Sequence, residues 1–182
     1  SLQARKLSPC QLASDAFGRN IAAGIGGGFC LAGVPADRGE VFWFSEQFDE
    51  DEVRWLLGDG PYQLKISALE LLASVAVFKE VYSPSSQMRL RFCLKTDSLV
   101  STQVQQRWYS RVQILNCFLK EVALTLLQYD ASLEFVHVPG VANLWADCLS
   151  RGDLHGFNAA KRIRVNPFAR SWWLCVPDSA II

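Results

Sequence analysis

The stretch FVHVPGVANLWADCLSRG, residues 135–152, contains an alternating apolar run, a Pro-Gly turn and then a helical pattern that an aspartate interrupts. The alternation predicts a strand at 132–139, and the apolar spacing after the turn predicts a helix at 142–151. The aspartate is Asp147, and its neighbours in this helix are mostly apolar. An ionised carboxylate in apolar surroundings is unfavourable unless a cation or a hydrogen-bond donor compensates it. Asp147 is therefore a candidate site residue.

The chain before this stretch changes between strand-like and helix-like patterns. The predicted strands are 11–17, 20–34, 40–48, 89–97 and 132–139, and the predicted helices are 66–82, 98–129 and 142–151. The charged segment 49–62 ends in Gly-Asp-Gly-Pro, which predicts a loop. This order predicts an α/β fold in which helices flank a mixed five-stranded sheet. We expect one domain over 1–151, followed by a tail at 152–182 that packs on the core or on a neighbouring domain.

Composition restricts the class of protein. The 182 residues are 50% hydrophobic, and 18 basic residues balance 18 acidic ones, so net charge points to neither a nucleic-acid nor a membrane partner. Every apolar run is shorter than the roughly 18 residues that a membrane span requires. The six cysteines form no C-x-x-C pair, which favours reduced thiols in an intracellular protein and argues against a zinc site. The chain opens on Ser instead of Met, which suggests a fragment of a longer polypeptide.

Four acidic residues lie among apolar neighbours in or beside the predicted strands and helices: Asp15, Glu70, Asp97 and Asp147. Such positions, drawn from distant parts of one chain, suggest convergence on a metal ion. Mg²⁺ prefers carboxylate oxygens, and two such ions about 4 Å apart activate the attacking water and stabilise the leaving oxygen of a phosphodiester. The pattern therefore indicates a metal-dependent nuclease.

Each of these residues also has a local explanation that the sequence leaves open. Glu70 could close a capping box with Ser67, and Asp97 could cap the next helix. Asp147 could form an exposed ion pair with the arginine one helical turn later. Asp15 is unusual because Asp is depleted inside strands, although a misplaced strand boundary would put it in a turn.

The order of the motifs is more specific than any single residue. The segments SDAFGRNIAAGIGGGF (14–29), ISALELLA (66–73), LKTDSLVSTQV (94–104) and FVHVPGVANLWADCLSRG (135–152) resemble the four motifs of the ribonuclease H domain of retroelement reverse transcriptases. The resemblance covers about residues 11–151. Its last motif is similar to gypsy-type and DIRS-type retrotransposon domains, and LELLA with the preceding FWFS strand favours the DIRS type.

This resemblance implies a function and assigns roles. Asp15, Glu70, Asp97 and Asp147 match the family's four catalytic, metal-binding carboxylates. They would hold two Mg²⁺ ions, with Mn²⁺ as a substitute: Asp15 bridging both ions, Glu70 and Asp97 completing one, and Asp147 the other. The implied reaction is endonucleolytic cleavage of the RNA strand of an RNA–DNA hybrid during reverse transcription. The implied partners are the hybrid and a polymerase domain in the same polypeptide.

Two groups of residues are candidates for nucleic-acid contact. Gly24 and Gly26 would let the backbone approach either the minor groove of the hybrid or a neighbouring strand across a β-bulge, and the bulge is the preferred explanation. Arg107, Trp108 and Arg111 cluster ahead of the main part of the long helical segment, where the resemblance implies an element that grips the hybrid. A solvated helix start explains this second group equally well.

The candidate functions fall into three classes. The four intact carboxylates favour an active ribonuclease over a catalytically inactive structural or interaction module of the same fold, which stays an open alternative. A transposase or integrase of the wider superfamily is disfavoured, because there the glutamate lies in the last helix, whereas here the last helix carries Asp147.

Overall fold

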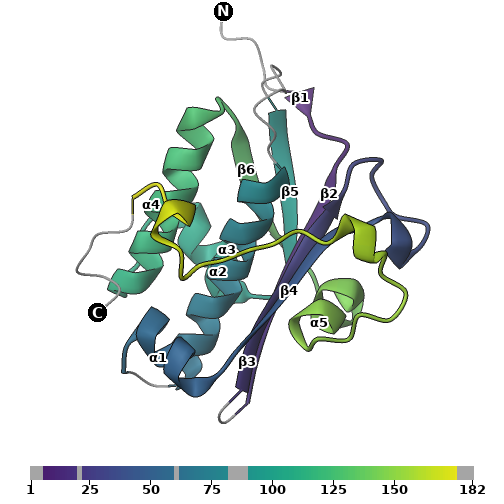
Figure 1. The fold of residues 1–182 in the computed structure, drawn as a ribbon. Coiled ribbons are helices and arrows are strands. Elements are labelled where there is room, and N and C mark those ends of the chain that lie inside the picture. Colours follow the sequence, from purple (N-terminus) through teal and green to yellow (C-terminus); the bar gives the residue numbers. More distant parts are fainter. Residues whose placement is uncertain (1–5, 20–21, 60–61, 82–89, 176–182) are drawn as a thin grey trace, which may run out of the picture.

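The computed structural model describes residues 6–19, 22–59, 62–81 and 90–175 (Figure 1). The strands are β1 (Lys6–Leu7), β2 (Gln11–Arg19), β3 (Ala22–Cys30), β4 (Phe42–Phe48), β5 (Leu90–Thr96) and β6 (Ser132–His137). The α-helices are α1 (Glu50–Leu57), α2 (Tyr62–Val81), α3 (Leu99–Arg107), α4 (Gln113–Gln128) and α5 (Leu144–Ser150). The break predicted at 83–87 and the last seven residues of the tail lie outside the described residues.

The sheet is mixed, with β4, β3, β2, β5 and β6 side by side in that order. The β2–β3 and β3–β4 pairs are antiparallel, and the β2–β5 and β5–β6 pairs are parallel. Both β1 and β2 pair with β5, so the two-residue β1, which the sequence did not predict, continues the β2 position in the sheet. The predicted mixed five-stranded sheet flanked by helices is confirmed.

Helices cover both faces of the sheet, and neighbouring residues of β2 show which helix covers which face. The Ser14 hydroxyl lies 2.9 Å from the Ser74 hydroxyl of α2, whereas Asp15 accepts a hydrogen bond from Ser150 of α5. Successive side chains of a strand point to opposite faces. Therefore α2 and α5 pack on opposite faces, and in Figure 1 α5 lies apart from α1–α4.

The main core lies between the sheet, α2 and α4. From Ala68 to Phe78 of α2, every side chain except that of Glu70 is buried. A helix that is apolar all round must be covered on all sides, and here the sheet, α4 and the tail cover it. Among the described residues, no helix is both long and apolar enough to cross a membrane.

The prediction of a loop over 49–62 was wrong, because α1 occupies most of this segment. The Asp49 side chain accepts from the Glu52 backbone N–H at 2.9 Å, and the Glu52 carboxylate accepts from the Asp49 N–H at 3.0 Å. This is a capping box, and Gly58 ends the helix with a positive φ of 71°. The Asp-x-x-Glu pattern of this capping box is present in the sequence, but it lies within a run of charged residues that was interpreted as a loop.

The single helix predicted over 98–129 is in fact two helices, α3 and α4. Trp108 ends α3 in the left-handed region, with a φ of 51°. The Asn116 side chain then closes the connection, accepting from the Ser110 N–H at 2.7 Å and donating to the Ser110 carbonyl at 2.6 Å. Because this closure depends on a side chain from the following helix, helical periodicity alone could not indicate the break.

The glycines of β3 allow α5 to lie directly on the sheet. A Cβ at Gly24 would lie 2.3 Å from the Ser150 carbonyl oxygen, and one at Gly26 would lie 2.1 Å from the Ser150 nitrogen. The β-bulge expected here was wrong, because Gly24 and Gly26 pair with both neighbouring strands in uninterrupted register over the described length of β3. Contact of Gly24 and Gly26 with nucleic acid stays a prediction. The close packing of α5 already explains why both positions are glycine.

The first part of the tail runs beside β4, the edge strand. Ile163 donates its backbone N–H to the Trp43 carbonyl at 2.7 Å, and the Trp43 ring nitrogen donates to the Asn158 carbonyl at 2.9 Å. These bonds satisfy backbone groups at an edge that would otherwise be open to another strand.

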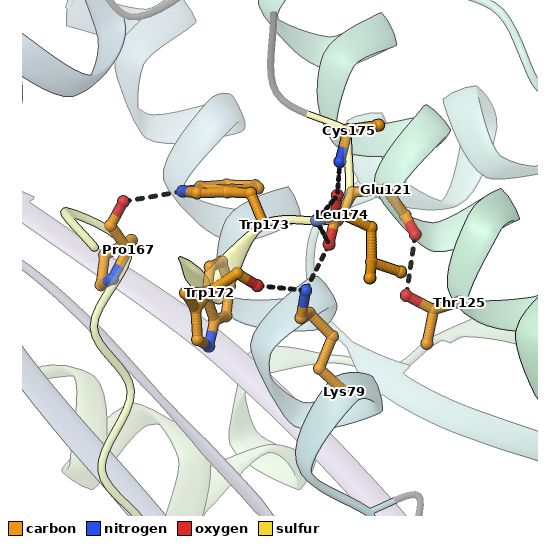
Figure 2. Close-up of polar contacts among 8 residues, drawn as sticks. All are labelled: Lys79, Glu121, Thr125, Pro167, Trp172, Trp173, Leu174 and Cys175. Carbon is orange, nitrogen blue, oxygen red and sulfur yellow. Dashed lines mark hydrogen bonds and ion pairs between the residues drawn. The ribbon is translucent and has the colours of Figure 1, made fainter. Parts of the chain in front are cut away.

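The last described part of the tail reaches α2 and α4 (Figure 2). Glu121 of α4 is fully buried, and its carboxylate accepts from Lys79 of α2 and from the backbone N–H groups of Leu174 at 2.9 Å and Cys175 at 3.1 Å. Trp173 is buried beside them. The division into a domain ending at residue 151 and a tail stays a prediction. The described part of the tail, through Leu174 and Cys175, contacts the core.

Candidate active site

Asp15 lies inside β2 and is only 5% exposed. Its Oδ2 atom accepts a hydrogen bond of 2.6 Å from the Ser150 hydroxyl. The alternative that Asp15 lies in a turn is wrong, because β2 pairs continuously with β3 from Gln11 to Arg19.

Asp97 follows the last residue of β5. Ala13 of β2 pairs with Lys95 of β5, so continuing this parallel register by two residues places Asp97 beside Asp15. The alternative that Asp97 caps α3 is wrong, since Ser98 is the cap and accepts from the Ser101 N–H at 3.1 Å. The Oδ1 atom of Asp97 is buried without a hydrogen-bond partner among the described residues. Such an oxygen is expected where a cation binds.

Glu70 lies on α2 and faces Asp97. Burial raises the pKa of Glu70, the charge of Asp97 acts in the same direction, and a hydrogen bond with Ser98 opposes them. The capping-box alternative is wrong, because α2 begins at Tyr62 and Ser67 is inside the helix. The Glu70 carboxylate is therefore directed to the site and not to a helix end.

The Asp147 side chain is 42% exposed. Its Oδ1 atom accepts from the Arg151 Nε at 2.7 Å, so the ion pair expected as a local alternative is present. The Arg151 guanidinium also lies over the Phe17 ring, 4.9 Å from the centroid. Asp147 is close enough to Asp15 for its charge to raise the pKa of that residue.

The nearby carboxylates Asp97 and Asp147 affect the pKa of Asp15. Burial raises the pKa of Asp15 from 3.8 to about 7, the hydrogen bond from Ser150 opposes this rise, and the nearby Asp97 and Asp147 add to it. The structure thus brings Asp15, Asp97 and Asp147 together and places Glu70 beside Asp97.

We expect the metal-free protein to lose stability as the pH rises from about 4 to about 7. The unfolded chain releases the Asp15 proton near 3.8 and the folded protein near 7, so the folded state holds the extra proton between these values. A folded state that binds more protons becomes less stable as the pH rises. Thermal unfolding in a chelator from pH 4 to 8 measures this, and Asp15→Asn should flatten the decline. An equal slope in Asp15→Asn would contradict the assignment.

The four carboxylates fit Mg²⁺ in type, because this cation prefers oxygen ligands and keeps part of its shell for water and substrate phosphate. Among the described residues, no three His, Cys, Asp or Glu side chains already form a closed ligand set. The Asp147–Arg151 and Asp15–Ser150 hydrogen bonds each engage one carboxylate oxygen of the candidate site. The buried Oδ1 of Asp97 has no hydrogen-bond partner among the described residues and is therefore suited to contact a cation.

The predicted nucleic-acid cluster lies at the α3–α4 connection, where Arg107, Trp108 and Arg111 are exposed. Trp108 lines a groove of about 510 Å³ together with Tyr109 and Lys120. α3 starts two residues after Asp97 and, with nine residues, is about 14 Å long, so Trp108 lies at the opposite end of this helix from Asp97.

Sequence reasoning missed three residues around the carboxylates. Ser150 binds Asp15, and Asn143 is buried and donates to the Ser14 carbonyl at 2.9 Å. Gly140 leaves room for Asp97, whose Oδ2 would be 3.2 Å from an added Cβ. All three belong to the stretch 135–152, but nothing local indicates which residue each one meets.

No family model matches this chain, and neither does any curated protein sequence. Its backbone is similar to solved structures, including ribonuclease H1 from the halophilic archaeon Halobacterium salinarum, with a TM-score of 0.57 and 16% identity over 80% of this chain and 96% of that one. LC11-RNase H1 in complex with an RNA/DNA hybrid has a TM-score of 0.57 and 17% identity over 79% and 94% of the two chains.

The prototype foamy virus protease–reverse transcriptase is also similar, with a TM-score of 0.50 and 13% identity. That similarity covers 87% of this chain and 22% of the viral one. Identities this low establish the fold and not the activity. The protein therefore has a ribonuclease H-like fold, as the sequence predicted.

Proposed function

We propose that this protein is a metal-dependent endonuclease that hydrolyses the RNA strand of RNA–DNA hybrids. The observation that carries the proposal is the convergence of Asp15, Asp97 and Asp147, with Glu70 beside Asp97, from four separate elements of the fold. Placing negative charges together without compensation is unfavourable, so a site of this kind is expected to bind cations.

The four carboxylates would hold two Mg²⁺ ions, or Mn²⁺ in their place, and these ions would supply an activated water and stabilisation of the leaving oxygen. The chain itself positions these ligands: Ser150 orients Asp15, and Asn143 fixes the backbone of β2 next to it. The exposed Arg107 and Arg111 are suited to phosphates and Trp108 to a base or sugar. Discrimination of RNA from DNA would come from contacts to the 2′-hydroxyl.

We propose further that the domain acts in retroelement reverse transcription, inside the cell, beside a polymerase domain of the same polypeptide. The similarity to part of a foamy virus protease–reverse transcriptase supports this context. The resemblance of the motifs at 66–73 and 135–152 supports a gypsy-type or DIRS-type element.

A second candidate is an inactive module of the same fold in a retroelement-derived protein. The observation that favours it is the ion pair between Asp147 and Arg151, which already compensates one of the four carboxylates. If this pair persisted in the presence of Mg²⁺, the second ion would lack its ligand.

The test is incubation of the protein with Mg²⁺ or Mn²⁺ and three labelled substrates: an RNA–DNA hybrid, single-stranded RNA and duplex DNA. We expect cleavage of the RNA in the hybrid alone, with 3′-hydroxyl and 5′-phosphate ends. Binding of the hybrid without cleavage under both metals would support the inactive module instead.

A further inference from the structure

The hydroxyl of Ser150 lies within hydrogen-bond distance of two acceptors, although it has only one proton to donate. It is fully buried at the end of α5, with its hydroxyl oxygen 2.6 Å from Asp15 Oδ2 and 2.9 Å from the Asp147 carbonyl. A hydroxyl has one proton to donate, and the carbonyl three residues earlier would satisfy it. A bond to an ionised carboxylate is the stronger of the two, so the proton is donated to Asp15 when that group is charged.

The surrounding residues hold Ser150 in this place. Gly26 is the β3 residue paired with Asp15, and its missing side chain, together with that of Gly24, lets the Ser150 backbone approach the sheet. From β4, Ser45 donates to the Leu149 carbonyl at 2.6 Å and Gln47 donates to the Ser150 carbonyl at 3.0 Å. The end of α5 is thus anchored to two strands while its hydroxyl reaches a third.

We propose that Ser150 is a positioning residue for the metal site, an inference that rests on the proposed function. Its hydroxyl engages Oδ2 of Asp15 and joins Asp15 to the helix that carries Asp147. Two candidate ligands that are far apart in the chain are thereby held as one unit. Partners of this kind orient ligands before the ion arrives and so raise metal affinity.

The test compares Ser150→Ala with the matched variant Ser45→Ala in the same 182-residue chain. Ser45 is also buried and also bonds to the end of α5, but it does not touch Asp15. Mn²⁺ affinity is measured by calorimetry without nucleic acid, folding by urea denaturation, and kcat and KM on the hybrid. We expect Ser150→Ala to weaken Mn²⁺ binding about tenfold or more and to lower kcat with little change in KM. Ser45→Ala should lower stability and weaken Mn²⁺ binding far less than Ser150→Ala does, because the hydroxyl that reaches Asp15 is still present.

Equal Mn²⁺ affinity in wild type and Ser150→Ala overturns the proposal, as does an equal loss in Ser45→Ala, which would mean that loosening α5 is sufficient. If Ser150→Ala does not fold, Ser150→Cys replaces it, because a thiol is close in size and a much weaker donor. A wild type that binds Mn²⁺ but leaves hybrids uncut refutes the proposed function alone, since the affinity comparison needs no cleavage. A wild type without Mn²⁺ binding refutes both.

Discussion

If the proposed function holds, Asp97→Asn should abolish cleavage of the RNA–DNA hybrid, lowering kcat by about a thousandfold or more, while the protein remains folded. Asn preserves the shape of the side chain but removes the charge that a cation requires. Asp97 stands between Asp15 and Glu70, and its buried Oδ1 has no partner among the described residues. A single-turnover cleavage assay with Mg²⁺ and with Mn²⁺ measures the loss.

The same substitution should raise the melting temperature of the metal-free protein. Without a cation, and at a pH above the pKa of about 7 at which Asp15 loses its proton, the negative charges of Asp15, Glu70 and Asp97 repel one another, and removing one of them relieves this repulsion. A gain of about 1 kcal/mol corresponds to roughly 2–4 °C for a chain of this size. Adding Mg²⁺ should raise the melting temperature of wild type more than that of Asp97→Asn.

Asp51→Asn is the matched control, because Asp51 is an exposed aspartate of α1 whose side chain is 90% accessible. It should change neither cleavage nor the melting temperature. An Asp97→Asn protein that cuts as well as wild type would show that the site is assigned wrongly.

Glu121→Ala should destabilise the protein by about 3–5 kcal/mol, since it leaves Lys79 without its partner in a largely buried place. The substitution also removes the acceptor for the backbone N–H groups of Leu174 and Cys175, which should release this part of the tail from α4. Urea denaturation measures the loss, and hydrogen exchange at Leu174 and Cys175 reports the release.

Two further variants compare how much a buried ion pair and an exposed ion pair contribute to the stability of the protein. Glu134→Gln breaks an ion pair with Arg91 in which both side chains are about half exposed, and it should leave the unfolding midpoint almost unchanged. The double variant Lys79→Met with Glu121→Leu should recover much of the stability lost in Glu121→Ala, because no charge is then left alone. A Glu121→Ala protein as stable as wild type would mean that the tail is not held by this carboxylate.

The sequence alone determined the main strands and helices and their order, because periodicity and turn chemistry act within a few residues. It also indicated four carboxylates in apolar surroundings, and for Glu70 and Asp97 the structure removes the local alternatives. The loop predicted at 49–62 was wrong because the capping box of α1 lies within a run of charged residues. The single helix predicted at 98–129 was wrong because the chain connection after Trp108 is closed by Asn116, a residue of the next helix.

Only the tertiary structure decided which side chains meet. Ser150 and Asp15 are 135 positions apart, and Glu121 meets the Cys175 N–H over 54 positions. A hydrogen bond between such groups has no counterpart in local sequence, because it depends on the packing of α5 against Gly26 and of the tail against α2 and α4. Periodicity shows that a face of a helix or strand is buried, and the packing of the whole chain decides what that face is buried against.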